Sequence, residues 1–560
     1  MTVYWMVWDA AARWIVDRLE AEGALPAVSE LRARGCRAAG RPPTPNCQTP
    51  PSLATLFTGA ATGEHGVSGF GVPGDGDVFG YESGFAPGFP ARPPVWRTLA
   101  GRGVRTAFVH APWVFDGEGR VGATVDAAIE AYSTRSARYD VLPLTPGAVT
   151  AWPAGGLPVE VDTTAGGVLL RAGGTSYDLT GSPSWTPVRL GAGTGFWARC
   201  RDTARGPALV RTGTWTARTA GADRSLVDAL AGTPVFAGEG VGPLYRGGLF
   251  GPRLVDGGDG SAEEEFVASV DCVVRSFGAA VQAVLDGHHA DLVVMYLPWT
   301  DDIGHEMSGW CDERSAAHRP KEAARIWDAV RHCYRAADDL LGRVLRRAAE
   351  DDTVILGADH GMVGSTHLVH VNEALIAAGL AARGADGGLD PRRSDVVYHP
   401  ANNGSLRVNH EGLAHGRVPA RLTGVTMRRA LAALRELRGP HGALPVVRGF
   451  LDERGRPLDE AEPGPLAFVV LADDYQPSSA VDGGPVLRPM PKSAAHVVNT
   501  GDDRLHATFA AAGPGLPAGA DLGEVDNSLA ARLVLHRFGA GPEPDEPCVP
   551  LLARCPEGTP

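Results

Sequence analysis

The sequence predicts an α/β fold with a doubly wound, mostly parallel sheet and helices on both faces. Short apolar runs alternate with long helical stretches four times along the 560 residues. Each run is almost continuously apolar, as expected for a parallel strand buried on both faces. Polar side chains follow directly after several of these runs, and ligands of such sheets bind outside the carboxyl ends of the strands.

The first strand–helix unit lies at the N-terminus. The run TVYWMVW at residues 2–8 ends at Asp9, and helical patterns follow at 14–23 and 25–34, the second closed by Gly35. The same unit recurs in strands at 104–112, 291–302 and 352–361, each preceded by a predicted helix, at 95–103, 263–287 and 326–351. Four parallel strands joined by long crossovers favour a doubly wound sheet.

Two segments interrupt this pattern. Residues 152–219 consist of short Val, Leu, Thr and Trp runs separated by Gly and Pro, a composition typical of β-hairpins. Residues 386–489 carry a helix and a strand of their own. We therefore expect a catalytic core in three parts (1–150, 263–384 and 490–560), a β-rich insertion (151–262) and a small α+β cap segment (385–489).

Composition restricts the class of protein. The chain is 44% apolar and 21% charged, as in globular proteins. A formal net charge of −13 without a Lys/Arg block argues against a nucleic-acid duplex or an anionic membrane as partner. The first fourteen residues resemble no secretory signal, and eight cysteines without a CxxC pair suit reduced thiols. These features predict a cytoplasmic protein of undetermined oligomeric state.

Carboxylates and imidazoles gather after the predicted strands. Any one of them alone is more often a helix cap or a surface residue. Together, at the ends of three separate strands and before a late apolar run at 507–516, they provide the mixed oxygen and nitrogen ligands that suit zinc or manganese. The candidate ligands are Asp9, Asp301, His305, Asp359, His360 and His496.

Thr49 is the candidate nucleophile. It lies between a Pro-rich turn and an apparently helical stretch, so its hydroxyl is expected at a helix N-terminus, where free amides stabilise a phosphate. A threonine hydroxyl is a weak nucleophile at neutral pH, and coordination to a cation activates it. Without the metal ligands, helix capping is the preferred interpretation.

These motifs resemble the type I phosphodiesterase / nucleotide pyrophosphatase family of the alkaline-phosphatase superfamily, along nearly the whole chain. The resemblance covers the Asp after the first strand, the Thr-x-Pro nucleophile motif, the Asp-x-x-x-His pair, an Ala-Asp-His-Gly-Met segment and a late His. The matching residues are Asp9, Thr49, Pro51, Thr58, Gly59, His65, Gly66, Asp301, His305, Asp359, His360 and His496.

The resemblance implies two divalent metal ions per chain, Zn²⁺ or alternatively Mn²⁺. One would be held by Asp301, His305 and His496, and the other by Asp9, Asp359 and His360, with Thr49 touching the second. Such a pair, about 4 Å apart, clamps the attacking and leaving oxygens of an in-line displacement. The implied activity is hydrolysis of phosphodiester or pyrophosphate bonds in a small phosphate ester or nucleotide, through a phosphothreonine intermediate.

Two departures from the family pattern leave alternatives open, one at Phe70 and one at the last histidine, which lacks the Gly usual on its far side. Phe70 stands where diesterases of the family often carry an Asn, so a phosphomonoesterase, phosphonate hydrolase or phosphomutase is the alternative. His506 is a rival to His496 as the last ligand. Cys47 lacks the Cys-x-Pro-x-Arg pattern of sulfatases, so sulfatase activity is disfavoured. A more distant alternative is an inactive metal-binding scaffold. No substrate-binding residue is predicted.

Overall fold

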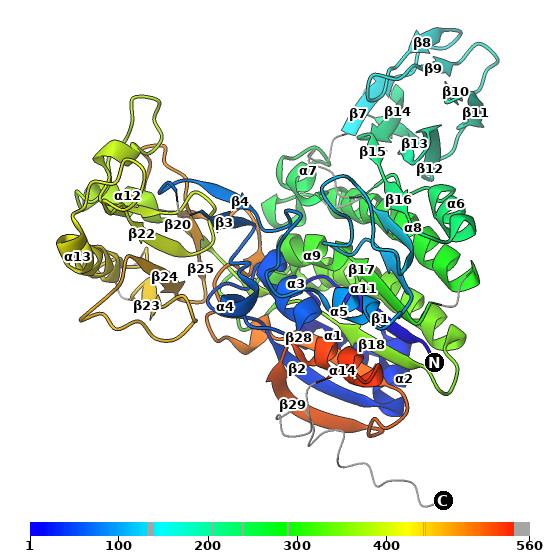
Figure 1. Ribbon diagram of the computed structural model, residues 1–560. Helices are drawn as coiled ribbons and strands as arrows, with labels where there is room; N and C mark the ends of the chain where they lie inside the picture. Colours follow the sequence, from blue (N-terminus) through cyan, green and yellow to red (C-terminus); the bar gives the residue numbers. More distant parts are fainter. Residues whose placement is uncertain are drawn as a thin grey trace, which may run out of the picture.

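The computed structural model describes residues 1–541 except 75, 132–138, 204–205, 238–239, 288–289, 441 and 443 (Figure 1). Its centre is a nine-stranded sheet in the order β16-β6-β5-β17-β1-β18-β28-β2-β29. The strands, in chain order, are β1 (Val3–Trp8), β2 (Cys36–Arg41), β5 (Thr106–Val109), β6 (Val125–Glu130), β16 (Arg218–Ala220), β17 (Leu292–Leu297), β18 (Thr353–Gly357), β28 (Ala507–Ala512) and β29 (Ala520–Asp526).

The four strands expected from the sequence are neighbours at the middle of this sheet. β1 pairs in parallel with β17 and β18, and β17 pairs in parallel with β5. β28 is antiparallel to both β18 and β2, and β16 is antiparallel to β6, so the sheet is mostly and not entirely parallel. The predicted α/β fold class is confirmed.

Alternation along β1 divides the core into two layers. Tyr4, Met6 and Trp8 pack into one apolar cluster, whereas Val3 and Val7 pack into another on the opposite face. Each fully buried valine contributes roughly 1.5–3 kcal/mol. The first cluster is covered by α1 (Arg13–Ala21), α2 (Pro26–Arg34), α6 (Arg224–Ala231), α8 (Ser261–Gly287) and α11 (Ala323–Arg347), and the second by α3 (Thr49–Thr58), α5 (Val95–Ala100) and α14 (Leu529–Arg537).

Helix α8 is the longest apolar helix. Among the described residues it alone is long and apolar enough to cross a membrane, by length and composition. More than half of its most apolar window is buried inside the protein, where it packs against α11. These contacts are those of a core helix covering the sheet.

The β-rich part forms two antiparallel sheets beside the core, at the upper right of Figure 1. One has the order β12-β13-β14-β7, with β15 paired to β13, and the other has the order β11-β10-β9-β8. Their strands are β7 (Tyr139–Pro143), β8 (Val149–Ala151), β9 (Val159–Asp162), β10 (Leu169–Ala172), β11 (Thr175–Asp178), β12 (Thr186–Gly191), β13 (Thr194–Thr203), β14 (Gly206–Thr212) and β15 (Trp215–Thr216).

A second unit, in which all strand pairs except β20–β25 are antiparallel, lies on the other side of the core, at the left of Figure 1. Its four-stranded sheet packs against two helices around a separate apolar cluster, and a three-stranded sheet adjoins it. Its elements are β20 (His367–His370), α12 (Val371–Ala377), β21 (Val396–Tyr398), β22 (Ser405–Val408), α13 (Thr423–Arg435), β23 (Val447–Leu451), β24 (Leu466–Leu471), β25 (Tyr475–Ser478) and β26 (Leu487–Pro489).

Short elements complete the connections. They are α4 (Thr62–His65), β3 (Gly71–Pro73), β4 (Tyr81–Ser83), α7 (Gly242–Arg246), η1 (Leu254–Asp256), α9 (Trp299–Ile303), η2 (Gly304–Ser308), α10 (Gly309–Cys311), β19 (Val363–Gly364), η3 (Pro391–Arg393), η4 (Ala420–Leu422), β27 (Ala494–Ala495) and η5 (Asp503–Leu505). The Gly69–Gly74 stretch, which formally matches a dinucleotide-binding loop, runs into the β3–β4 hairpin instead of a helix.

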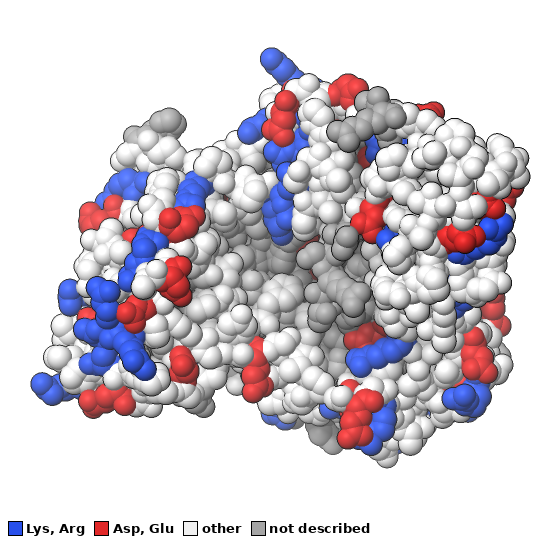
Figure 2. All heavy atoms as spheres, turned by 90° about the horizontal axis from the view of Figure 1, so that it is seen from above, with Lys and Arg blue, Asp and Glu red and all other residues white. Residues whose placement is uncertain are grey.

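The molecule is hollowed between the part that carries α13 and the rest of the chain, as Figure 2 shows. Acidic and basic side chains are interspersed around this face, and neither sign forms a continuous surface. A mixed surface of this kind lacks the uniform field that attracts a polyanion.

Candidate metal centre

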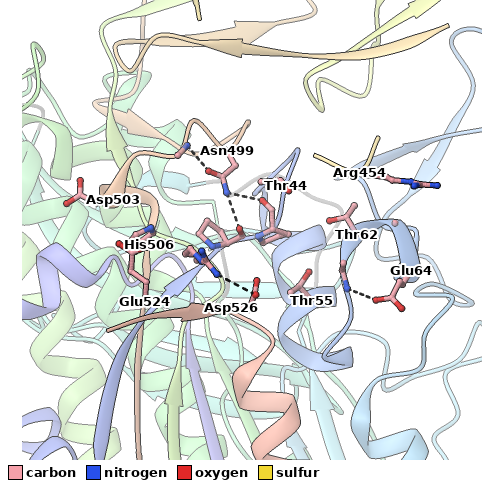
Figure 3. Close-up of a pocket in the computed structure, with 16 residues that line it drawn as sticks. Thr44, Thr55, Thr62, Glu64, Arg454, Asn499, Asp503, His506, Glu524 and Asp526 are labelled. Atoms are coloured by element: carbon pink, nitrogen blue, oxygen red, sulfur yellow. Dashed lines mark hydrogen bonds and ion pairs between the residues drawn. The ribbon is translucent and has the colours of Figure 1, made fainter. Parts of the chain in front are cut away.

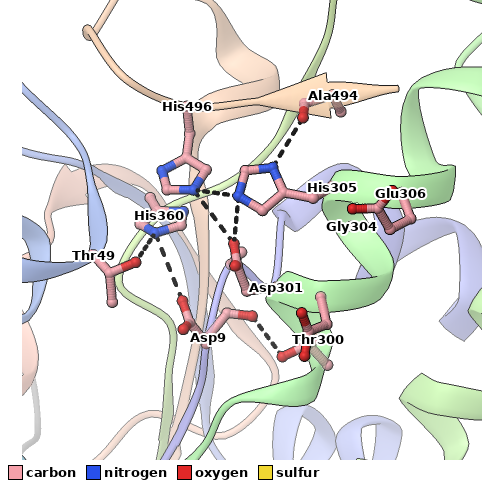
Figure 4. Close-up of polar contacts among 12 residues, drawn as sticks. Asp9, Thr49, Thr300, Asp301, Gly304, His305, Glu306, His360, Ala494 and His496 are labelled. Atoms are coloured by element: carbon pink, nitrogen blue, oxygen red, sulfur yellow. Dashed lines mark hydrogen bonds and ion pairs between the residues drawn. The ribbon is translucent and has the colours of Figure 1, made fainter. Parts of the chain in front are cut away.

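Asp301, His305 and His496 form one group of ligand atoms. α9 and the π-helical turn η2 carry Asp301 and His305 four residues apart, which brings both side chains to one helix face. His305 Nε2 lies 3.4 Å from Asp301 Oδ1, and His496 Nε2 lies 3.3 Å from both. The three ligand atoms lie within 4.8 Å of one another (Figure 4). π-Helical turns are frequent at functional sites.

The second group adjoins the first at the ends of β1 and β18. His360 Nε2 lies 3.1 Å from Asp359 Oδ2 and 3.6 Å from Asp9 Oδ1. The ligand atoms of Asp9, His360 and Asp301 also lie within 4.8 Å of one another, so Asp301 stands between the two groups. The imidazoles of His360 and His496 stack with ring centroids 3.6 Å apart. All six predicted ligands therefore meet at one edge of the sheet.

The three histidines share one orientation. His305 Nδ1 bonds the carbonyl of Ala494 at 2.9 Å, and His496 Nδ1 bonds the carbonyl of Cys47 at 3.2 Å. His360 Nδ1 bonds the carbonyl that follows it at 3.1 Å. Because a carbonyl only accepts, each Nδ1 carries a proton, and each Nε2 faces the centre, where a cation can take its lone pair. This tautomer and direction are those of metal-ligating imidazoles.

The carboxylates are oriented by groups that the sequence patterns did not identify. The hydroxyl of Tyr296 donates to Asp9 Oδ2, and Thr300 Oγ1 donates to the carbonyl of Asp9 at 2.5 Å. The backbone N–H of Ala10 donates to Asp359 Oδ1 at 2.9 Å. Asn527 Nδ2 donates to the carbonyl of Asp359 at 2.6 Å. None of these contacts leaves a spacing signal, because each joins separate elements.

Electrostatics favour the ligand protonation states. Burial raises the pKa of Asp301, but the imidazoles of His305 and His496 lower it by more, so it lies well below its usual range. Burial lowers the pKa of His305 and of His496. The carboxylate form of Asp301 and the neutral form of the two imidazoles are the forms that bind a metal ion.

The pKa of His360 shifts the other way. Burial lowers it, and the adjacent carboxylate of Asp359 outweighs that effect, so the net pKa is raised. A cation held by the same carboxylates competes with this proton. The donor set, the tautomers and the buried carboxylates fit two divalent cations.

Thr49 lies at the edge of this cluster. It is the first residue of α3, and Pro50 and Pro51 follow it, as favoured in the first turn of a helix. Its Oγ1 lies 3.4 Å from His360 Nε2, and the residue is 6% exposed. The helix N-terminus directs its free amides and positive dipole end to the same place. The hydroxyl predicted as nucleophile thus faces the second ligand group.

The unit at the left of Figure 1 contacts the segment that directly precedes Thr49. Asn46 Nδ2 donates to the carbonyl of Asn403 at 2.7 Å, and Gln48 Nε2 donates to the carbonyl of Asn402 at 3.3 Å. Phe70 donates its backbone N–H to Gln48 Oε1, while its ring is 49% exposed beside Phe85. The Phe70 side chain therefore offers a ring and no hydrogen-bond donor.

His506 lies elsewhere. It lines a cavity of about 820 Å³ together with Thr55, Asn499, Glu524 and Asp526 (Figure 3). In the described part of the chain it belongs to neither group of ligand atoms. The geometry therefore places His496, and not its rival, beside Asp301 and His305.

Comparisons with known proteins were made by sequence and by structure. No curated protein sequence matches the chain significantly. The solved structure of human ectonucleotide pyrophosphatase/phosphodiesterase 5 has a TM-score of 0.47 and 11% identity to it, covering 98% of this chain and 97% of that one.

The model of the type I phosphodiesterase / nucleotide pyrophosphatase family matches residues 6–157 and 214–441. The matched segments include Asp9, Thr49, Asp301, His305, Asp359 and His360, and the gap covers strands β9–β14 of the β-rich part. His496 lies beyond the match. The family expected from the motifs is confirmed: this chain belongs to the type I phosphodiesterase / nucleotide pyrophosphatase family and is a phosphoric ester hydrolase.

Proposed function

We propose that the chain hydrolyses phosphodiester or pyrophosphate bonds with the help of two divalent cations and a covalent phosphothreonine at Thr49. The observation that carries this proposal is the convergence of three imidazole Nε2 atoms and three carboxylates beside one threonine hydroxyl. The substrate is a small phosphate ester or nucleotide.

The ligand sets follow the two groups of atoms. Asp301, His305 and His496 hold one cation, and Asp9, Asp359 and His360 hold the other. Mixed imidazole and carboxylate ligands favour Zn²⁺, with Mn²⁺ as the alternative. Bound cations supply Lewis-acid stabilisation of the charge that develops on the phosphoryl oxygens.

The chain's own groups carry out two displacements. In the first, Thr49 Oγ forms a bond to phosphorus and loses its proton to solvent, while the bond to the leaving oxygen breaks and its electron pair leaves with that oxygen. In the second, a water oxygen bonds to phosphorus and gives up a proton, while the bond to Thr49 Oγ breaks and its electron pair stays on that oxygen, which regains a proton from solvent. The N-terminal amides of α3 stabilise the anionic phosphoryl group throughout.

Metal analysis and one substitution test this proposal. The purified protein is expected to hold about two zinc or manganese ions per chain, to lose activity with their removal and to recover it on their return. Thr49→Ala is expected to keep both ions and to lose turnover of bis-(4-nitrophenyl) phosphate. Thr423→Ala is the matched control, because Thr423 is also the first residue of a helix, α13, outside the centre.

A Thr49→Ala protein with full activity would end the proposal. The monoesterase alternative is separated by comparing kcat/KM for bis- and mono-(4-nitrophenyl) phosphate. We expect the diester to be preferred, and a clear preference for the monoester reassigns the reaction while leaving the ligand set in place.

A further inference from the structure

Lysine is rare in this chain. Of its 52 lysine and arginine residues, only Lys321 and Lys492 are lysines. Lys321 is exposed, whereas Lys492 is half-buried and precedes the ligand His496 by four residues. Arginine suits planar ion pairs, while lysine offers a compact ammonium that binds phosphate as a point charge. Lys492 is therefore the one lysine that lies close in sequence to a predicted metal ligand.

The backbone around Lys492 is fixed against the centre. Ser493 donates its N–H to the carbonyl of His305 at 2.9 Å, and its hydroxyl accepts from Gly309 N at 3.2 Å. The carbonyl that precedes Lys492 accepts from Arg253 Nη1 at 3.4 Å. Lys492 thus starts from a preorganised position next to the turn that carries Asp301 and His305.

The ammonium of Lys492 is not neutralised by a contact. Within the described chain no carboxylate lies within the 4.0 Å of an ion pair, and no hydrogen bond forms with this ammonium. Burial lowers its pKa, and Arg246 adds to this effect, whereas the carboxylates of Asp301, Glu306 and Asp302 oppose it. Asp302 accepts a hydrogen bond from the backbone N–H of Gly240. Glu306 already pairs with Arg246, and Asp301 faces two imidazoles. Lys492 is therefore a spare cation beside the centre.

Its side of the centre is the side away from the nucleophile. In Figure 4, Thr49 lies beside His360, whereas Glu306 lies on the opposite side, beyond His305. Lys492 leads directly into Ser493, whose N–H bonds the carbonyl of His305, so the backbone of Lys492 lies on the His305 side. In an in-line displacement the leaving oxygen departs opposite to the attacking oxygen. A leaving group displaced by Thr49 therefore departs toward the first ligand group, beside which the backbone of Lys492 lies.

Binding of two divalent cations would change the charge that Lys492 faces. Asp9, Asp301 and Asp359 bring three negative charges, and two divalent cations bring four positive charges. The attraction of Asp301 for Lys492 is then offset, and the three carboxylates together with the two cations carry one net positive charge. This positive charge and the ammonium of Lys492 together favour an anionic ligand.

We propose that Lys492 determines specificity by binding a phosphate or pyrophosphate leaving group, so that bonds whose leaving group is already anionic are preferred. This inference rests on the proposed function. As Thr49 Oγ bonds to phosphorus, the bond to the leaving phosphate oxygen breaks, and the electron pair leaves with that oxygen next to the ammonium.

Amine labelling tests binding without turnover. The metal-loaded protein is treated with acetic anhydride, and acetylation at Lys492 and at Lys321 is followed by mass spectrometry. An α,β-methylene analogue of thymidine 5′-triphosphate, which places a diphosphate beyond the scissile position, is expected to slow labelling of Lys492 by about 5-fold or more. Lys321 serves as the internal control, and thymidine 5′-monophosphate is expected to give no protection.

Kinetics test specificity with two substrates that share one nucleotidyl group. Thymidine 5′-triphosphate releases pyrophosphate, whereas 4-nitrophenyl thymidine 5′-phosphate carries a leaving group that is uncharged in the substrate. Lys492→Met is expected to lower kcat/KM for the triphosphate by about 100-fold and for the nitrophenyl ester by less than about 3-fold, since a charge-assisted contact is lost in one case only. Lys321→Met is expected to change neither.

The outcomes distinguish failure of the proposed function from failure of the proposed role of Lys492. Wild-type protein inactive on both substrates contradicts the proposed function itself. An active wild type with an equal loss on both substrates in Lys492→Met, or with no loss, overturns the role of Lys492 alone. Failure of Lys492 to label while Lys321 reacts fully, or equal protection by the monophosphate, also overturns it.

Discussion

The phenol of Tyr296 donates a hydrogen bond to Oδ2 of Asp9, although the two residues are 287 positions apart in the chain. Parallel pairing of β1 with β17 brings them together, because Val7 stands opposite Tyr296 in the register. The bond fixes one carboxylate oxygen and leaves Oδ1 directed toward His360. Tyr296 is thus a positioning residue for the second ligand group.

Removal of this hydroxyl is expected to weaken metal binding. Tyr296→Phe keeps the ring in the core and frees the Asp9 carboxylate to rotate, so we expect about 10-fold weaker binding of one of the two ions. Titration of the metal-free protein with zinc measures it. Tyr398→Phe is the control, because its buried hydroxyl accepts from Gly404 N away from the centre. Equal zinc affinity in both variants contradicts the positioning role.

The last ligand is tested by a pair of histidine substitutions. His496→Asn removes an Nε2 that lies 3.3 Å from Asp301, so one ion and at least about 100-fold in metal affinity are expected to be lost, the upper end of what a supporting hydrogen bond costs. His506→Asn, in the separate cavity, is expected to keep two ions per chain. The reverse result in metal analysis assigns the ligand to His506.

Acid sensitivity is expected from His65. Burial lowers its pKa to about 4, and its Nδ1 accepts from Val67 N while Nε2 bonds Thr55. The unfolded chain binds a proton near pH 6.5 and the folded chain does not until about pH 4, so stability is lost as the pH falls through this window. At pH 5 the loss is about 2 kcal/mol.

Urea unfolding at pH 7 and pH 5 measures this effect. His65→Asn keeps an acceptor for Val67 and does not titrate, so its free energy of unfolding is expected to fall less on acidification than that of the wild type. The hydrogen bond to Asp271 raises the pKa of His332, so protonated His332 stabilises the folded chain at acidic pH. In His332→Asn the free energy of unfolding is therefore expected to fall more on acidification than in the wild type. An unchanged pH dependence in His65→Asn argues against a buried neutral imidazole.

Much of the fold was predictable from local patterns. The run before Asp9 is apolar at every position because both faces of β1 are covered, and the run before Asp359 is buried in the same way. Thr49 could be placed at a helix N-terminus because two prolines follow it. Such signals lie within a few residues of the side chain they position.

The rest depends on contacts between distant elements. Tyr296, Thr300 and Asn527 support the carboxylates through bonds between separate elements, and no spacing in the chain reports such contacts. The choice between His496 and His506 likewise depends on which loop reaches η2. The π-helical turn that carries His305 also left no sign in the sequence, and its carbonyl partner Ser493 lies 188 positions away in the chain.

The phosphorylated form of Thr49 is the most direct test of the account. Metal-loaded protein is mixed with substrate, quenched in acid within the first turnovers and digested, and the peptide that contains Thr49 is analysed by mass spectrometry. We predict a phosphate on Thr49 that appears with substrate and is absent from Thr49→Ala. Rapid turnover with no phosphate on this residue at any quench time would contradict the account.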